Sequence, residues 1–396
     1  MVRNILRLVP IVCLGLFVLL TSLHLPQFGG VCFILFWLAA AILARGSELG
    51  RPFCYPLVVL GCVTSSMYFP GLYLNWFGVP TTKFVIPVLQ LIMFGMGTQL
   101  SLADFRQVTR QPWGVLIGVF AQFMIMPVAG FLIATTLPLP KEVAAGIILV
   151  GCVPSGIASN VMNFLAKANM ALSVTLTAVA TLLGPIITPL WMKALIGTSL
   201  DLDYMQMTWD IVRLVVLPIA AGLTFRALLP KTTKKMEKHL AFLSMIGLLL
   251  TIVFINAAGR DNLMKVGALL VFACLLHNTV GYILGYWLAK ACRLDERSCR
   301  TVSMEVGMQN GGLAAGLAIG LGRAATMGLA PAICSPLMNI TGATLAIWWR
   351  GRPIKNDNND ENDNSDNAND SSDKEPLAGS TSLLPEVNED ALCSKP

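Results

Sequence analysis

The sequence predicts an all-α polytopic membrane protein. Of its 396 residues, 55% are hydrophobic and only 13% are charged, whereas soluble domains carry about 25% charged residues. The mean hydropathy is +0.68. Runs such as "LLVFACLLHNTVGYILGYWLA" do not alternate polar with apolar residues, so they indicate spanning helices rather than the strands of a membrane barrel.

Twelve apolar stretches follow one another along the chain, and each approaches the roughly 20 residues that a spanning helix needs. They lie near residues 5–24, 30–45, 52–73, 83–100, 111–137, 143–166, 170–196, 210–229, 238–258, 263–291, 301–322 and 327–349. The second of them is short for a span.

Lys and Arg are unevenly divided between the loops. With the N-terminus in the cytoplasm, 19 of the 28 fall on cytoplasmic loops, seven on outer loops, and two, Lys374 and Lys395, near the C-terminus. Basic loop residues mark the cytoplasmic side, so we expect a multi-pass protein of the plasma membrane or an organelle membrane with a cytoplasmic C-terminal tail. Topology accounts for the basic runs, and no nucleic-acid partner is expected.

The two ends of the chain differ from its middle. Residues 1–50 hold two hydrophobic segments, which fit a hairpin or signal anchor if retained, or a cleaved signal peptide over residues 1–24. Residues 351–396 are rich in Asn and Asp and are expected to be a disordered cytoplasmic tail, because they cannot bury enough apolar surface to offset the entropy of ordering.

The cysteines and histidines offer no site for catalysis. The ten cysteines include no C-x-x-C pair and mostly lie within apolar runs, where we interpret them as small buried hydrophobes. The three histidines are scattered. With neither a metal cluster nor a nucleophile paired with a base, the protein is not expected to be an enzyme.

Polar residues interrupt the apolar stretch near residue 305. Glu305 is the only acidic residue well inside a predicted span, and Gln309 and Asn310 follow it among glycines in "EVGMQNGGLAAG". Glycine lets a helix unwind, and unwound backbone is tolerated at membrane depth only where it lines a cavity or is buried. The backbone carbonyl, amide and carboxylate oxygens of this segment suit a hard cation such as Na⁺. The alternative is a protonated glutamate that is hydrogen-bonded to a neighbouring helix.

A second interruption occurs in "GCVPSGIASNVMNF", where a proline and a glycine precede Ser159 and Asn160. Ser173 and Thr177 are four residues apart, so they share a face of the next helix. Taken alone, each hydroxyl is explained by a hydrogen bond to a backbone carbonyl of its own helix. Together with Asn160, they indicate a second polar site.

The two interruptions occupy corresponding places in the chain. Gln122 precedes Ser159 by 37 residues, and Asn278 precedes Asn310 by 32. This spacing predicts an internal repeat of five helices, about 52–196 and 210–349. Because five is odd, the two copies would have inverted topology, which is common in secondary transporters.

Four segments resemble the bile acid:sodium symporter family, particularly its bacterial and plastid-type branch. They are "IMFGMGTQLSLADF", "GCVPSGIASNVMNFLAKANMALSVTLTAV", "LLHNTVGY" and "EVGMQNGGLAA". The resemblance covers about residues 52–349. It implies a transmembrane domain over residues 51–350 with ten helices in two inverted five-helix repeats, divided into panel and core domains with crossed broken helices.

The same resemblance implies two sodium sites that share Glu305. The residues of the first would be Ser159, Asn160, Ser173, Thr177 and Glu305. The residues of the second would be Gln122, Glu305, Gln309 and the backbone carbonyls of Val306 and Met308.

The resemblance further implies a sodium-coupled symporter that moves a small organic anion by alternating access in the lipid bilayer. Asn310 and Asn339 are expected to meet the anion. The chain departs from the family pattern beside them, because Ile157 stands where a threonine is usual and Met338 where a histidine is usual. The alternative is a sensor or scaffold with a transporter fold and no transport activity.

Overall fold

The computed structural model describes residues 2–100, 110–197, 203–352 and 354. The N-terminal third holds α1 (Val2–Ser22), α2 (Pro26–Arg45), the short 3₁₀-helix η1 (Arg51–Phe53), α3 (Cys54–Tyr68), the single turn α4 (Gly71–Leu74) and α5 (Thr82–Gln99). Strands β1 (Asn75–Trp76) and β2 (Val79–Pro80) pair antiparallel between α4 and α5. Apart from residues 351, 352 and 354, the C-terminal tail that was predicted to be disordered lies outside the described ranges.

The remaining two thirds are helical. The helices are α7 (Pro112–Thr136), α8 (Lys141–Cys152), α9 (Ile157–Leu165), α10 (Met170–Ile196), α11 (Tyr204–Ile211), the π-helical turn η2 (Val212–Val216), α12 (Leu217–Leu228), α13 (Pro230–Ala258), α14 (Arg260–Ala291), α15 (Glu296–Gly307), α16 (Gly311–Gly320) and α17 (Leu329–Arg350).

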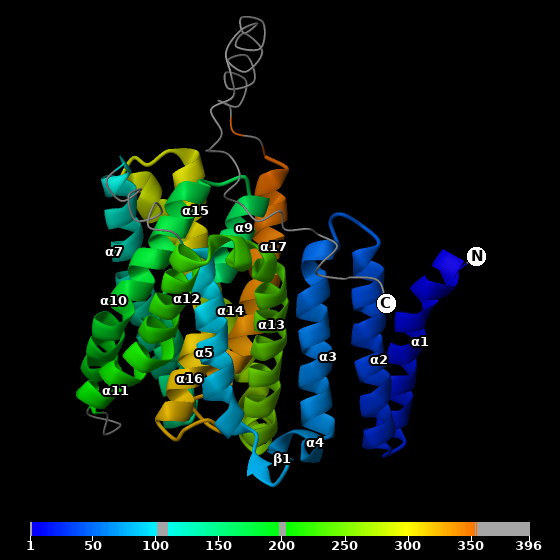
Figure 1. Cartoon of the computed structure of the whole chain (residues 1–396). Coiled ribbons are helices and arrows are strands. Elements are labelled where there is room, and N and C mark those ends of the chain that lie inside the picture. The colour runs from blue at the N-terminus through cyan, green and yellow to red at the C-terminus, as the bar shows by residue number, and fades with distance from the viewer. Residues whose placement is uncertain (1, 101–109, 198–202, 353, 355–396) are drawn as a thin grey trace, which may run out of the picture.

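Among the described residues, seven helical segments are long and apolar enough to span a bilayer. They are α2, α7, α10, the continuous run from α11 to α12, α13, α14 and α17. Helices also occupy the other predicted stretches, as α1, α3, α5 and the broken pairs α8–α9 and α15–α16. The protein is therefore an all-α polytopic membrane protein, as predicted, and Figure 1 shows its helices side by side.

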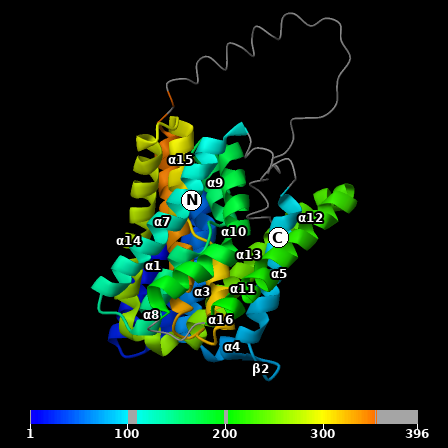
Figure 2. The same ribbon diagram turned by 90° about the vertical axis from the view of Figure 1, so that its left-hand side faces the viewer.

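Two runs of five elements repeat the same order. The first is α3, α5, α7, the broken pair α8–α9 and α10; the second is α11–α12, α13, α14, the broken pair α15–α16 and α17. Figure 2 shows α9 and α15 toward one end of the molecule and α8 and α16 toward the other. The two broken pairs therefore run in opposite directions, as inverted repeats require.

The helices pack in two groups. In one, α5 packs against α12 and α13, and α13 also contacts α3. In the other, α7, α8 and α10 pack with α14, α15 and α17. The groups meet where α16 lies against α5 and α13, and where α13 contacts α17.

The N-terminal segments form a helical hairpin beside this bundle. Helix α1 packs on α2, and α2 packs on α3. The rings of Phe17 and Phe33 stack with centroids 4.5 Å apart, and Gly30 lets α2 approach Tyr68 of α3 closely. The second apolar stretch, short in the sequence, extends to a 20-residue helix because it starts earlier, at Pro26.

One pair of cysteines differs from the sequence interpretation. Cys274 of α14 and Cys334 of α17 form a disulfide, although all ten were interpreted as small buried hydrophobes. Both side chains are completely buried where the two helices pack. Their separation of 60 positions in the sequence hid this pairing from an analysis of local motifs.

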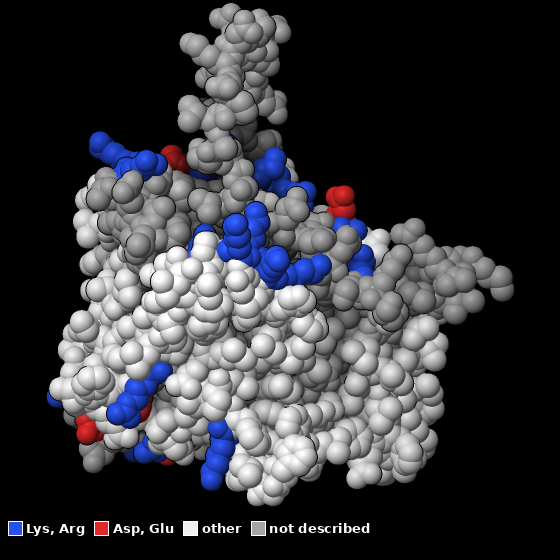
Figure 3. Space-filling model, viewed as in Figure 1, with Lys and Arg blue, Asp and Glu red and all other residues white. Residues whose placement is uncertain are grey.

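Charged side chains concentrate toward one end of the molecule. Figure 3 shows Lys and Arg gathered near the end where α15 begins and α17 ends, beside a broad surface with few charges. Exposed Lys234, Lys235 and Lys238 lie near the start of α13, and exposed Arg293 and Arg297 lie at the connection from α14 to α15. An uncharged band suits the hydrocarbon core, where charged side chains are costly.

The close crossing of α5 and α12 provides a test of the packing. In Gly222→Ala, the new methyl group would press on backbone atoms of Phe94 and Thr98, so we expect a loss of roughly 1–3 kcal/mol of stability. Thermal unfolding of the purified protein in detergent should show a lower Tm. The control is Gly15→Ala on α1, where nothing lies within 4 Å of the added carbon; equal Tm values for the two variants would contradict this packing.

Candidate functional site

Two helix breaks cross near the middle of the bundle. The first lies between α8 and α9, where Pro154 offers no N–H, and the second lies between α15 and α16. The N–H of Gly156 donates to the Met308 carbonyl at 3.3 Å, and the N–H of Asn310 donates to the Pro154 carbonyl at 2.8 Å. Each break thus satisfies backbone groups of the other, which unwound chain needs in a membrane.

Glu305 lies one turn before the second break and is 2% exposed. Its carboxylate accepts hydrogen bonds from side chains of α9, α10 and the first break. Oε1 accepts from Ser159 Oγ (2.8 Å), Ser173 Oγ (2.7 Å) and Asn163 Nδ2 (3.2 Å), and Oε2 accepts from Ser155 Oγ (2.6 Å) and Thr177 Oγ1 (2.9 Å). The only acidic side chain deep in the predicted spans is therefore surrounded by donors.

Asn160 completes the first predicted set. Its Oδ1 lies 2.6 Å from the Ser173 hydroxyl and 3.3 Å from the Thr177 hydroxyl. The structure therefore brings together all five residues assigned to the first sodium site, from α9, α10 and α15.

The second predicted set is adjacent but less compact. Gln122 Nε2 donates to Gln309 Oε1 at 2.6 Å and to the Val153 carbonyl at 3.1 Å, and Gln309 Nε2 donates to the Val306 carbonyl at 2.6 Å. The Met308 carbonyl accepts the Gly156 N–H across the crossing. Within the described residues, Ser159, Ser173 and Thr177 of the first set donate to Glu305, as do Ser155 and Asn163, whereas Gln122 and Gln309 do not.

The four residues expected to form the anion site come from α9, the start of α16 and α17. Ile157 is the first residue of α9, and Asn310 caps α16 by accepting the Leu313 N–H at 3.0 Å. Met338 and Asn339 lie on α17, which packs against both short helices. Met338 is buried, and Asn339 Nδ2 donates to the Ser335 carbonyl at 3.0 Å.

Both kinds of helix end meet at the crossing. The carbonyl ends of α8 and α15 lie there, and so do the N–H ends of α9 and α16. Carbonyl ends carry partial negative charge and N–H ends partial positive charge. One small region can therefore attract a cation and an anion at neighbouring points.

The oxygen atoms around Glu305 are of the kind that binds a hard cation. Gln122 Oε1 and Asn163 Oδ1 are buried and have no hydrogen-bond partner among the described residues. Buried acceptors without a partner are costly. Together with the Glu305 carboxylate and the nearby hydroxyls, they supply oxygen ligands of the kind that hard cations prefer.

Two side chains on Glu305 were missing from the sequence prediction. Ser155 lies within the first break, directly after the proline. Asn163 follows Ser159 by four residues on α9, so it shares the face that points at the carboxylate. The four-residue spacing from Ser159 is the feature of the sequence that could have identified Asn163.

A buried arginine of α15 holds the ends of two other helices near this site. Arg300 of α15 is 4% exposed and pairs with Glu296 at 3.1 Å. Its guanidinium donates to the carbonyls of Ala166 after α9 (3.4 Å), Trp349 (3.2 Å) and Arg352 (2.9 Å). The ends of α9 and α17 are thereby tied to the helix that carries Glu305.

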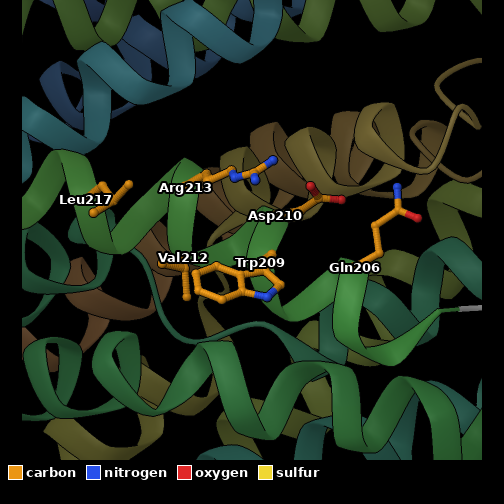
Figure 4. Close-up of a pocket in the computed structure, with 6 residues that line it drawn as sticks. All are labelled: Gln206, Trp209, Asp210, Val212, Arg213 and Leu217. Carbon is orange, nitrogen blue, oxygen red and sulfur yellow. The ribbon is translucent and has the colours of Figure 1, made fainter.

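A separate cleft lies along the helix from α11 to the start of α12 (Figure 4). It has a volume of about 410 Å³ and is lined by Gln206, Trp209, Asp210, Val212, Arg213 and Leu217. None of the predicted site residues lines it. The crossing around Glu305 therefore stays the candidate site.

Comparison with known proteins identifies the family of the chain. Residues 86–266 match the family described as the Sodium Bile acid symporter family. The chain is 41% identical over 282 residues to YocS of Bacillus subtilis (strain 168), named an uncharacterized sodium-dependent transporter; this covers 71% of the chain and 86% of YocS.

Plastid proteins are also similar. The chain is 35% identical over 299 residues to the probable sodium/metabolite cotransporter BASS2, chloroplastic, of Oryza sativa subsp. japonica, covering 74% of this chain and 69% of that protein. It is 33% identical over 298 residues to the corresponding BASS1 of Arabidopsis thaliana, covering 75% and 73%. These relatives are named as transporters, not enzymes, and the chain belongs to the sodium bile acid symporter family.

Proposed function

We propose that the protein is a sodium-coupled symporter of a small organic anion. The observation that carries this proposal is the buried Glu305 carboxylate, which five side chains contact at the crossing of two broken helices. The names of the relatives, sodium-dependent transporter and sodium/metabolite cotransporter, support sodium as the coupling ion. A scaffold without transport would not need this concentration of oxygen ligands.

Two sodium ions are proposed to bind around Glu305. The first would use Ser159, Asn160, Ser173 and Thr177, and the second would use Gln122, Gln309 and the carbonyls of Val306 and Met308. Two monovalent cations beside one carboxylate leave a net positive charge, which attracts an anion strongly where screening is poor. Sodium and substrate would then strengthen each other's binding equally.

The anion is proposed to bind where α9 and α16 begin. Half-helix N-termini at the membrane midplane recognise anionic groups in secondary transporters. Asn310 and Asn339 would supply polar contacts, while Ile157 and Met338 make the surroundings apolar. These residues favour a small carboxylate such as a 2-oxo acid or a pantoate-like acid, or a sterol acid.

Transport is proposed to proceed by alternating access. Residues 51–350 would form the transmembrane domain, with repeats over about 52–196 and 210–349. The group of α7 to α10 with α14 to α17 would be the core, and it would rock against the panel helices α3, α5, α11–α12 and α13. Each charge that crosses gains about 2.3 kcal/mol per 100 mV, so two sodium ions can concentrate a monovalent anion.

Uptake into proteoliposomes tests the coupling. With radiolabelled pyruvate, pantoate and cholate as probes, we expect accumulation of the matching carboxylate under an inward sodium gradient. Glu305→Ala should abolish it, because the cations lose their only carboxylate. Glu305→Gln keeps the shape of the side chain and should fail equally, whereas Glu48→Gln, at an exposed position, should transport normally. Equal uptake in potassium-only medium would refute sodium coupling.

The proposed topology keeps residues 351–396 in the cytoplasm, with residues 1–50 as a hairpin or signal anchor. An epitope tag at the C-terminus should bind antibody only after selective opening of the plasma membrane, whichever membrane holds the protein. A tag in the connection before Lys141 marks the opposite side and serves as the control. Staining of the C-terminal tag in intact cells would reverse the proposed orientation.

A further inference from the structure

Two side chains that contact Glu305, Ser155 and Asn163, lie outside both proposed ligand sets. We propose that Asn163 belongs to the first sodium site, where its Nδ2 positions Glu305 and its Oδ1 is an additional ligand to the cation. This inference rests on the proposed sodium coupling. It assigns Asn163 a role in sodium affinity in addition to any structural role in the packing of α9.

The amide of Asn163 is held on its nitrogen side. Asn163 is 0% exposed, and its Nδ2 donates to Ser173 Oγ at 2.8 Å and to Glu305 Oε1 at 3.2 Å. Ser173 in turn lies 2.7 Å from the same carboxylate oxygen. Asn163 therefore fixes both Glu305 and a second proposed sodium ligand.

The oxygen side of the same amide is not satisfied. Asn163 Oδ1 is buried and has no hydrogen-bond partner among the described residues. Rotating the amide would exchange the two atoms and bring Oδ1 against the negatively charged Oε1 of Glu305, which is unfavourable without a cation between them. In either orientation, a cation beside Glu305 Oε1 gives Asn163 Oδ1 the partner that it lacks, because amide oxygens are good ligands for hard cations.

The neutrality of the amide also matters. An aspartate at this position would supply oxygen ligands too, but it would add a second negative charge. Two sodium ions and two carboxylates would have no net charge, and the attraction for the anion would fall. Asparagine is thus the residue that adds a ligand while leaving the positive balance on which anion binding depends.

The test is a titration of thermal stability with sodium. The purified full-length protein is unfolded in detergent at rising NaCl, with KCl replacing it at constant total salt. A bound ion stabilises the folded state by mass action, so the half-saturating sodium concentration can be read from Tm. We expect Asn163→Ala to raise that concentration about tenfold, the usual scale for loss of a residue that orients metal ligands.

Two further variants complete the design. Asn163→Asp nearly preserves the shape of the side chain and should lower the half-saturating sodium concentration, because the ligand becomes charged. The matched control is Asn262→Ala, which removes an amide that donates to the Ala325 carbonyl at 2.9 Å and should leave the sodium titration unchanged.

The outcomes separate the two proposals. If the wild-type protein shows no stabilisation specific to sodium, the proposed coupling fails. If the wild type responds but Asn163→Ala reaches half saturation at the same concentration, sodium coupling stands and the role of Asn163 is refuted, even where its Tm is lower in both salts. Should Asn163→Ala not fold, an unchanged or higher half-saturating concentration in Asn163→Asp overturns the inference.

Discussion

The pairing of two unwound segments is the constraint on which the rest of the structure depends. Backbone that leaves a helix inside a membrane must find partners, and here the segments around Ser155 and Gln309 supply them to each other. This pairing fixes α9 beside α15. Only then can hydroxyl and amide groups of α9 and α10 reach the Glu305 carboxylate, and only then do two pairs of opposed helix ends meet in one place.

The surrounding helices hold that arrangement from one end. Arg300 ties α15 to the ends of α9 and α17, and the turn before α10 is joined to α15 by the hydrogen bond from the Asn169 N–H to Thr301 Oγ1 at 2.9 Å. These contacts lie within a turn or two of Glu305, so the carboxylate sits on a stiff support. Ion ligands that must stay within a few tenths of an ångström benefit from such support.

The sequence predicted the helical fold and the location of both breaks, because apolar length and the placement of proline and glycine are local properties. It also identified Glu305, since a carboxylate is conspicuous among apolar residues. Asn163 and Ser155 escaped prediction because their contacts with Glu305 depend on how the first break and α9 face α15 across the crossing. The Cys274–Cys334 disulfide escaped for the same reason: only the packing of α14 on α17 brings those residues together.

The N-terminal hairpin changes what the bilayer can influence. Helix α3 receives α2 along one side, with Trp37 close to Gly61 and the Cys54 thiol near the Ala41 carbonyl at 3.4 Å. On that side, α3 therefore meets fixed aromatic and aliphatic side chains where it would otherwise meet exchanging lipid tails. While the hairpin is present, differences in acyl-chain length or order between membranes reach that side of α3 through α2.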